Sequence, residues 1–127
     1  MIHGYIRVST EKQEFEGQRS EIEDYAEKNG LSVENWIEIK ISSRKNRKER
    51  RIDELMARLK TGDTLIVSEL SRLGRSTGEV INIINELIAK GIYFHAIKQG
   101  LRINGNMDIT SKVMVTMLSL FAELERI

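Results

Sequence analysis

The stretch Tyr5-Ile6-Arg7-Val8-Ser9-Thr10 decides both the fold and the chemistry expected of this chain. Apolar and polar residues alternate from Ile2 to Val8, which predicts a first β-strand. Open α/β sheets gather their functional groups at the carboxyl ends of their strands. Because strand side chains alternate with a period of two, Arg7 and Ser9 share one face. The strand therefore ends on a candidate nucleophile beside a phosphate-binding group.

The rest of the chain alternates strands with helices. Apolar runs bounded by turn residues predict further strands over 31–39, 64–67 and 92–97. Helical spacing, caps and glycine stops predict helices from the Thr10 cap to Asn29-Gly30, around 52–59, and from Ser76 or Thr77 to Lys90-Gly91. This order predicts an α/β fold with a mostly parallel sheet of four to five strands flanked by helices on both faces.

The last segment, from about residue 107, predicts a long helix that is apolar around much of its circumference. Its apolar residues are Met107, Ile109, Val113, Met114, Val115, Met117, Leu118, Leu120, Phe121 and Leu124. Such a helix needs burial on more than one side, either in its own core or against another subunit. Both alternatives stay open. The pattern reaches residue 127 without a stop signal, so we expect a truncated C-terminal region.

Composition narrows the class of protein. The 127 residues suit a single domain, and 40% hydrophobic with 31% charged residues is ordinary for a globular protein. Without cysteine, and with two isolated histidines, His3 and His95, the chain has no conventional zinc-ligand set. No apolar run is long enough to span a membrane, and no basic leader precedes an apolar stretch, so we expect a cytoplasmic protein.

Three arginines are expected to meet at one edge of the sheet. Arg7 follows the first strand, and Arg72 and Arg75 follow the third, which can lie beside the first after one crossover. Guanidinium groups bind phosphate oxygens through paired hydrogen bonds and would stabilise the charge added in a pentavalent transition state. Cations at a helix start oppose the helix dipole, which favours an arriving anion. Without these arginines, a serine at position 9 would more often be a helix-cap residue than a nucleophile.

Other phosphate chemistries lack their motifs here. The chain has no Gly-x-x-x-x-Gly-Lys-Ser/Thr loop, and no carboxylate cluster stands at the predicted strand ends as two-metal nucleases require. Transesterification by a single serine remains, in which a phosphoserine bond replaces a phosphodiester at nearly equal energy. These residues predict an enzyme that breaks DNA in order to rejoin it.

The same motifs resemble the N-terminal catalytic domain of the serine recombinases, the resolvases and DNA invertases. The resemblance runs from Tyr5-x-Arg7-Val8-Ser9-Thr10 through Leu70-x-Arg72-Leu73-Gly74-Arg75 to the segment 122–126. It implies that Ser9 attacks the DNA and becomes joined to a 5′-phosphate, and that the three arginines bind and activate the scissile phosphate. Gln13 and Gln18 match supporting polar positions, although Gln13 also has a full explanation as a capping residue.

The resemblance implies that residues 1–127 form a catalytic domain, and it also implies the partners of that domain. These are double-stranded DNA and further copies of the chain, which form a homotetramer from two homodimers through the long C-terminal helix. The resemblance implies a reaction that needs neither metal nor cofactor, and it implies neither a small-molecule substrate nor a membrane. The resemblance also implies a separate helix-turn-helix domain beyond this chain. The origin implied is bacterial: a plasmid, a transposon or a phage.

Other site residues are less well defined by the resemblance. Relatives usually carry Asp where this chain has Ser71. The carboxylate often discussed as an aid to proton transfer is therefore absent, and no residue of this chain is assigned its role. The family has an active-site arginine in a mobile loop, and the run 44–51, with six positive residues and one negative, offers Arg44 and Arg47, with Arg58 a weaker candidate. Glu125 and Arg126 complete the supporting set.

Two other functions remain as alternatives. One is a catalytically inactive assembly or regulatory module of a DNA-binding protein. The absence of the aspartate at position 71 is consistent with this alternative. The retained Ser9 and arginines argue against it. The other, a small-molecule phosphate-binding protein, is disfavoured because the chain lacks a glycine-rich phosphate loop.

Overall fold

A computed structural model of the chain describes residues 1–8, 12–40, 54–74, 76–103 and 109–125. Its five strands form one sheet in the order β2-β1-β3-β4-β5. The strands are β1 (Ile2–Val8), β2 (Asn35–Lys40), β3 (Thr64–Val67), β4 (Tyr93–Ala96) and β5 (Leu101–Ile103). The first four run parallel, and β5 runs antiparallel to β4. The predicted α/β fold with a mostly parallel sheet is confirmed.

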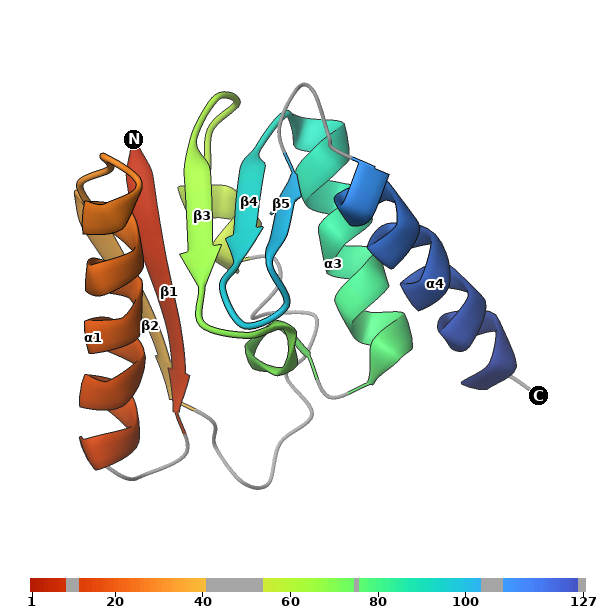
Figure 1. Cartoon of the computed structure of the whole chain (residues 1–127), viewed down its shortest axis with the longest axis horizontal. Helices are drawn as coiled ribbons and strands as arrows, with labels where there is room; N and C mark the ends of the chain where they lie inside the picture. Colours follow the sequence, from red (N-terminus) through yellow and green to blue (C-terminus); the bar gives the residue numbers. More distant parts are fainter. Residues whose placement is uncertain (9–11, 41–53, 75, 104–108, 126–127) are drawn as a thin grey trace.

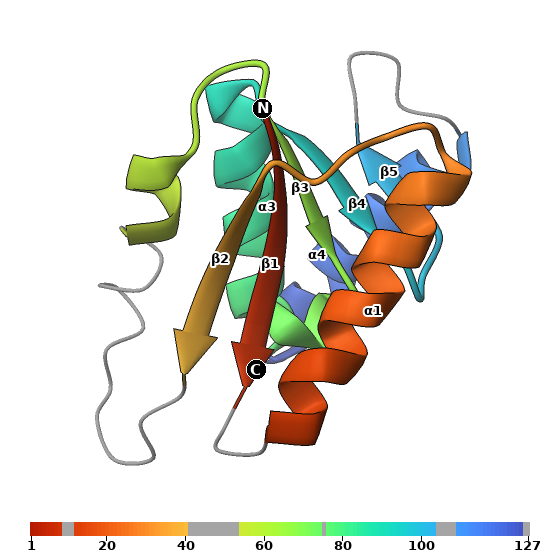
Figure 2. The ribbon, with the colours of Figure 1, turned by 90° about the vertical axis from the view of Figure 1, so that its left-hand side faces the viewer.

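Helices cover both faces of the sheet, as Figures 1 and 2 show. They are α1 (Lys12–Lys28), the one-turn 3-10 helix η1 (Leu70–Arg72), α3 (Thr77–Lys90) and α4 (Ile109–Glu125), and residues 54–58 are also helical. On one face α1 packs Ile22 and Ala26 against Ile6 and Ile66. The larger core on the other face joins α3 to side chains of every strand. β1 and β3 lie in the interior of the sheet and contribute apolar side chains to the cores on both faces.

The boundaries of α3 follow from its two end residues. The Ser76 side chain accepts a hydrogen bond from the Glu79 main-chain NH at 3.1 Å, as an N-cap does. At the other end Gly91 has φ of 80°, a left-handed conformation that glycine adopts without steric cost. Both ends agree with the positions predicted from the sequence, so α3 begins directly after the arginine-rich segment.

Two details differ from the sequence-based prediction. The second strand begins at Asn35 rather than Leu31, and the antiparallel β5 was not identified as a strand. On α4 only Ser111 and Ala122 are fully buried. A stripe of apolar side chains on α4 is exposed: Ile109, Val113, Met117, Leu120, Phe121 and Leu124. Packing within its own domain thus covers one side of α4 and leaves the other open.

None of the helices in the described part of the chain is long and apolar enough to cross a bilayer.

Candidate active site

The carboxyl ends of β1 and β3 lie side by side, as the crossover argument predicted. These strands are paired in parallel, and the last pair in their register joins Tyr5 to Val67. Arg7 stands just beyond that pair, and the segment that carries Arg72 begins just after Val67. The two predicted phosphate-binding arginines therefore come from neighbouring strand ends.

Arg7 and Arg72 are in direct contact. Nη1 of Arg7 donates a hydrogen bond to the main-chain carbonyl of Arg72 at 3.3 Å. Both residues are partly buried, at the point where β1 meets η1. The contact fixes the Arg7 side chain against the main chain of Arg72, so the two arginines lie together at the carboxyl ends of β1 and β3.

Gln18 holds the main chain of Arg7 from α1. Its Oε1 accepts from the Arg7 NH at 3.2 Å, and its Nε2 donates to the Arg7 carbonyl at 3.0 Å. The Gln18 side chain is buried. Because β3 no longer pairs with β1 at this point, the glutamine amide satisfies main-chain groups that burial would otherwise leave unpaired. Gln18 thus fixes the main chain of Arg7, and its supporting role in catalysis stays a prediction.

The segment after β3 is braced by the turn between β4 and β5, residues 97–100. The Lys98 NH donates to the Ser68 carbonyl at 2.9 Å, and Gln99 Oε1 accepts from the Leu70 NH at 3.2 Å. Within η1, the Arg72 NH donates to the Glu69 carbonyl at 3.1 Å. The position of Arg72 thus depends on a turn distant in sequence, and sequence reasoning missed Gln99 because it missed β5.

Ser71 lies on this same segment and pairs with a carboxylate. Its hydroxyl donates a hydrogen bond to Oε1 of Glu69, and Lys98 Nζ lies 3.8 Å from Oε2 of the same carboxylate. The hydrogen bond from Ser71, together with the charges of Lys98 and Arg72, lowers the pKa of Glu69. Glu69 was not predicted as a site residue. Its only signal in the sequence is a carboxylate two positions before Ser71.

Glu125 connects the end of α4 to the start of α3. Its carboxylate accepts hydrogen bonds from the main-chain NH groups of Thr77 and Gly78 at 3.3 and 3.2 Å. Hydrogen bonds from Thr77 and Gly78 lower the pKa of Glu125. A carboxylate is favourable there because NH groups at a helix start have no partner within the helix and the helix dipole is positive. Glu125 thus lies by the helix that follows the arginine segment.

The remaining predicted residues divide into two groups. Arg58 is exposed in the helical stretch 54–58, and no contact in the described part of the chain joins it to Arg7 or Arg72. Outside the described residues lie Ser9, Arg44, Arg47, Arg75 and Arg126, and the side chain of Gln13 is not described either. The structure therefore brings together Arg7, Arg72, Gln18 and Ser71.

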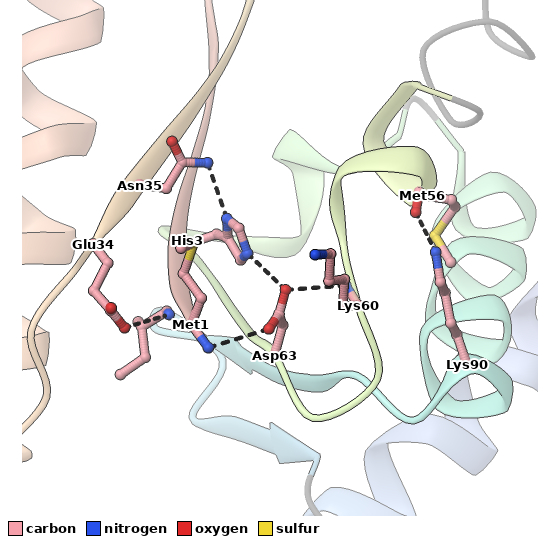
Figure 3. A network of polar contacts seen from close by, with 9 residues as sticks. Met1, His3, Glu34, Asn35, Met56, Lys60, Asp63 and Lys90 are labelled. Carbon is pink, nitrogen blue, oxygen red and sulfur yellow. Dashed lines mark hydrogen bonds and ion pairs between the residues drawn. The ribbon is translucent and has the colours of Figure 1, made fainter.

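A second polar cluster lies at the opposite, amino-terminal end of the sheet, as Figure 3 shows. Asp63 Oδ2 contacts His3 Nε2 at 2.9 Å and accepts from the Lys60 NH at 3.0 Å, while Oδ1 accepts from the Met1 amino group at 3.1 Å. Burial raises the pKa of Asp63, but these hydrogen bonds outweigh it and lower the pKa to about 2. Asn35 Nδ2 contacts His3 Nδ1 at 3.0 Å. This cluster joins β1 and β2 to the loop before β3.

Comparison with known proteins gives one consistent result. The family model described as the N-terminal domain of resolvases matches residues 2–127. A resolvase of Clostridium perfringens is 34% identical over 126 residues, covering 99% of this chain and 64% of the relative. The serine recombinase PinR of Escherichia coli (strain K12) is 37% identical over 129 residues, covering 98% and 62%. The transposon Tn3 resolvase of Escherichia coli is 33% identical over 125 residues, covering 98% and 63%.

Solved structures show the same fold. The N-terminal catalytic domain of TP901-1 integrase superposes with a TM-score of 0.73 at 23% identity, covering 98% of this chain and 95% of that one. A resolvase family site-specific recombinase from Streptococcus pneumoniae gives a TM-score of 0.72 at 23% identity, covering 98% and 87%. The chain spans less than two thirds of the length of the curated relatives named above.

Proposed function

The chain belongs to the resolvase family of serine recombinases, and we propose on that premise that residues 1–127 are the catalytic domain of a site-specific DNA recombinase. The observation that carries the proposal is the contact between Arg7 Nη1 and the Arg72 carbonyl, which holds two arginines together at the carboxyl ends of neighbouring strands. A site with this charge suits a phosphodiester.

In the proposed reaction Ser9 is the nucleophile. Its Oγ forms a bond to phosphorus as the bond from phosphorus to the 3′-oxygen breaks, which leaves a 5′-phosphoserine and a free 3′-hydroxyl. The proton lost by the serine hydroxyl balances the proton gained by the 3′-oxygen. Attack by a 3′-hydroxyl of another strand end reverses the step and releases Ser9. One phosphoester replaces another in each direction, so rejoining requires no ATP.

The arginines act on the phosphate. Arg7, Arg72 and Arg75 bind its non-bridging oxygens and stabilise the negative charge that grows in the pentavalent transition state. Gln18 supports them because it fixes the main chain of Arg7. Gln13, Arg44, Arg47, Arg58 and Arg126 are proposed as supporting residues on the basis of the family resemblance.

The proposed partners are double-stranded DNA and further copies of the chain. The exposed apolar stripe on α4 supports a homodimer, and two dimers would form the homotetramer that brings four strand ends together. Recognition of DNA bases then belongs to a helix-turn-helix domain outside residues 1–127, in keeping with the greater length of the relatives. The bacterial and transposon sources of these relatives support an origin in a mobile element.

A covalent adduct tests the proposal. The full-length protein is incubated with a supercoiled plasmid that carries its gene and flanking DNA, and denaturing gels then show whether protein is joined to 5′-phosphate ends. We expect an adduct from the wild type and none from Ser9→Ala. Ser20→Ala, which removes an exposed hydroxyl on α1, serves as the matched control. An adduct that persists in Ser9→Ala would contradict the assignment, and a wild type that forms none would favour the non-enzymatic assembly module.

A further inference from the structure

A carboxylate stands within the arginine segment, where the proposed reaction assigns it no role. Glu69 lies directly between β3 and η1, and its side chain is 29% exposed. Its oxygens are divided between two groups: Oε1 accepts from the Ser71 hydroxyl, and Oε2 faces Lys98 Nζ at 3.8 Å. A negative charge beside a phosphate site opposes phosphate binding, so its presence there needs an explanation.

The surroundings of Glu69 indicate a mechanical role. Glu69 begins the single turn whose end is Arg72, and its carbonyl accepts from the Arg72 NH at 3.1 Å. The β4–β5 turn holds the same segment, through Gln99 to the Leu70 NH. Figure 1 shows η1 and this turn lying close together. The hydrogen bond from the Ser71 hydroxyl to the Glu69 carboxylate adds a side-chain link to this turn. It joins residues 69 and 71, directly before Arg72.

We propose that Glu69, acting through the Ser71 hydroxyl, is a positioning residue that orients Arg72 for the scissile phosphate. This inference rests on the proposed function. A catalytic group must be held within about half an ångström of its productive position, and a one-turn 3-10 helix has too few main-chain bonds to do so alone. Lys98 offsets the carboxylate charge, so the pair orients Arg72 without competing strongly with the phosphate for its guanidinium.

A role for Glu69 as proton acceptor fits the site less well. The hydrogen bond from Ser71 and the charges of Lys98 and Arg72 favour the ionised carboxylate and lower its pKa, which makes it a weak base. In the described part of the chain these are the groups that act on its charge. An ionised carboxylate that accepts one fixed hydrogen bond is suited to holding a neighbour in place.

A double-mutant cycle tests the inference. The variants are Glu69→Gln, Ser71→Ala and both together, and the measurement is the rate of covalent adduct formation at saturating plasmid, with DNA affinity measured separately. We expect each single variant to slow the reaction about tenfold, and the double variant to be about as slow as either, since the two residues act as one unit. Affinity should change less than twofold. Glu86→Gln, which removes an exposed charge on α3, is the matched control.

A rescue distinguishes positioning from structural damage. Ser71→Asp places a carboxylate at position 71 itself, and we expect it to raise the rate of Glu69→Gln several-fold.

The rate of the wild type should fall at acidic pH as Glu69 is protonated, and Glu69→Gln should lose that dependence. Wild-type rates in Glu69→Gln, or a double variant about a hundredfold slower, would overturn the inference. A wild type without any adduct would instead overturn the proposed function.

Discussion

The buried amide of Gln18 binds both main-chain polar groups of Arg7, accepting from its NH at 3.2 Å and donating to its carbonyl at 3.0 Å. A side chain of α1 thus completes the hydrogen bonding of β1 where the neighbouring strand has ended. Asn or Asp is one methylene shorter and would reach less far from α1 toward these two groups, and Glu lacks the donor that the carbonyl requires.

Gln18→Ala should therefore destabilise the fold. Burying an unpaired NH and carbonyl costs about 1–3 kcal/mol, and urea denaturation would measure the loss. Gln18→Glu should lose a similar amount because its carboxylate faces the Arg7 carbonyl. Ser20→Ala, on the exposed side of the same helix, should change stability by less than about 0.5 kcal/mol. Equal stability of Gln18→Ala and wild type would show that the two contacts contribute nothing.

Arg7 and Arg72 should matter for cleavage far more than for folding. Arg7→Ala and Arg72→Ala should leave the melting transition nearly unchanged and lower the rate of adduct formation by about a hundredfold or more, a typical loss for one transition-state donor. Arg7→Lys keeps the charge but loses the planar fork, so it should remain strongly impaired. The control is Arg102→Lys, an exposed arginine on β5. Cleavage at the wild-type rate in both alanine variants would contradict the proposed site.

The Asp63 cluster should make stability depend on pH in the acidic range. Because the pKa of Asp63 is about 2 in the folded chain against an ordinary value of 3.8, the ionised carboxylate stabilises the fold above about pH 4. This contribution, about 2 kcal/mol, should disappear as pH falls through 2. Urea denaturation from pH 5 to pH 2 would show it, and the decrease should be smaller in Asp63→Asn. Asp24→Asn, on the exposed side of α1, should follow the wild type.

Gly4 and Gly17 should respond in opposite directions to alanine. A Cβ built on Gly4 would lie 2.4 Å from Cζ3 of Trp36, whereas nothing lies within 4 Å of one built on Gly17. Gly4→Ala should destabilise by about 1–3 kcal/mol through overpacking. Gly17→Ala, inside α1, should stabilise by up to about 1 kcal/mol because alanine favours helix. Thermal unfolding would compare them, and a harmless Gly4→Ala would mean that the indole ring moves aside at little cost.

The apolar stripe of α4 should drive self-association. Leu120→Asp and Phe121→Asp place a charge on the exposed side of this helix and should shift sedimentation toward the monomer. Lys112→Glu puts a carboxylate on the polar side of the same helix, and its oligomeric state should match the wild type. A wild type that remains monomeric at high concentration would show that the stripe does not suffice for assembly.

Local signals in the sequence predicted most of the architecture. The alternation over β1, the cap at Ser76 and the glycine at position 91 each mark an element boundary through the residues of that boundary itself, so the boundary was accurate. β5 was missed because three residues after Gly100 are too short for a periodic pattern. Its partner strand, rather than its own composition, makes it a strand.

The candidate site was predictable to the extent that topology determines it. The strand order β2-β1-β3 brings Arg7 beside the Arg72 segment, and the crossover rule allowed this neighbourhood although residue order alone did not determine it. The pairing of Glu69 with Ser71, and the hold of Gln99 on Leu70, depend on the geometry of two turns that meet only after folding. No periodicity in the sequence reports such contacts.

The short β5 also has a consequence for the solubility of the sheet. A sheet edge exposes main-chain donors and acceptors that can pair with another chain, and long flat edges promote aggregation. At this edge β5 offers only three residues, and Arg102 in its middle carries an exposed charge. Strand pairing between copies is therefore discouraged at β5. At this edge, contact between copies is left to side chains, whose shape can select one specific partner surface.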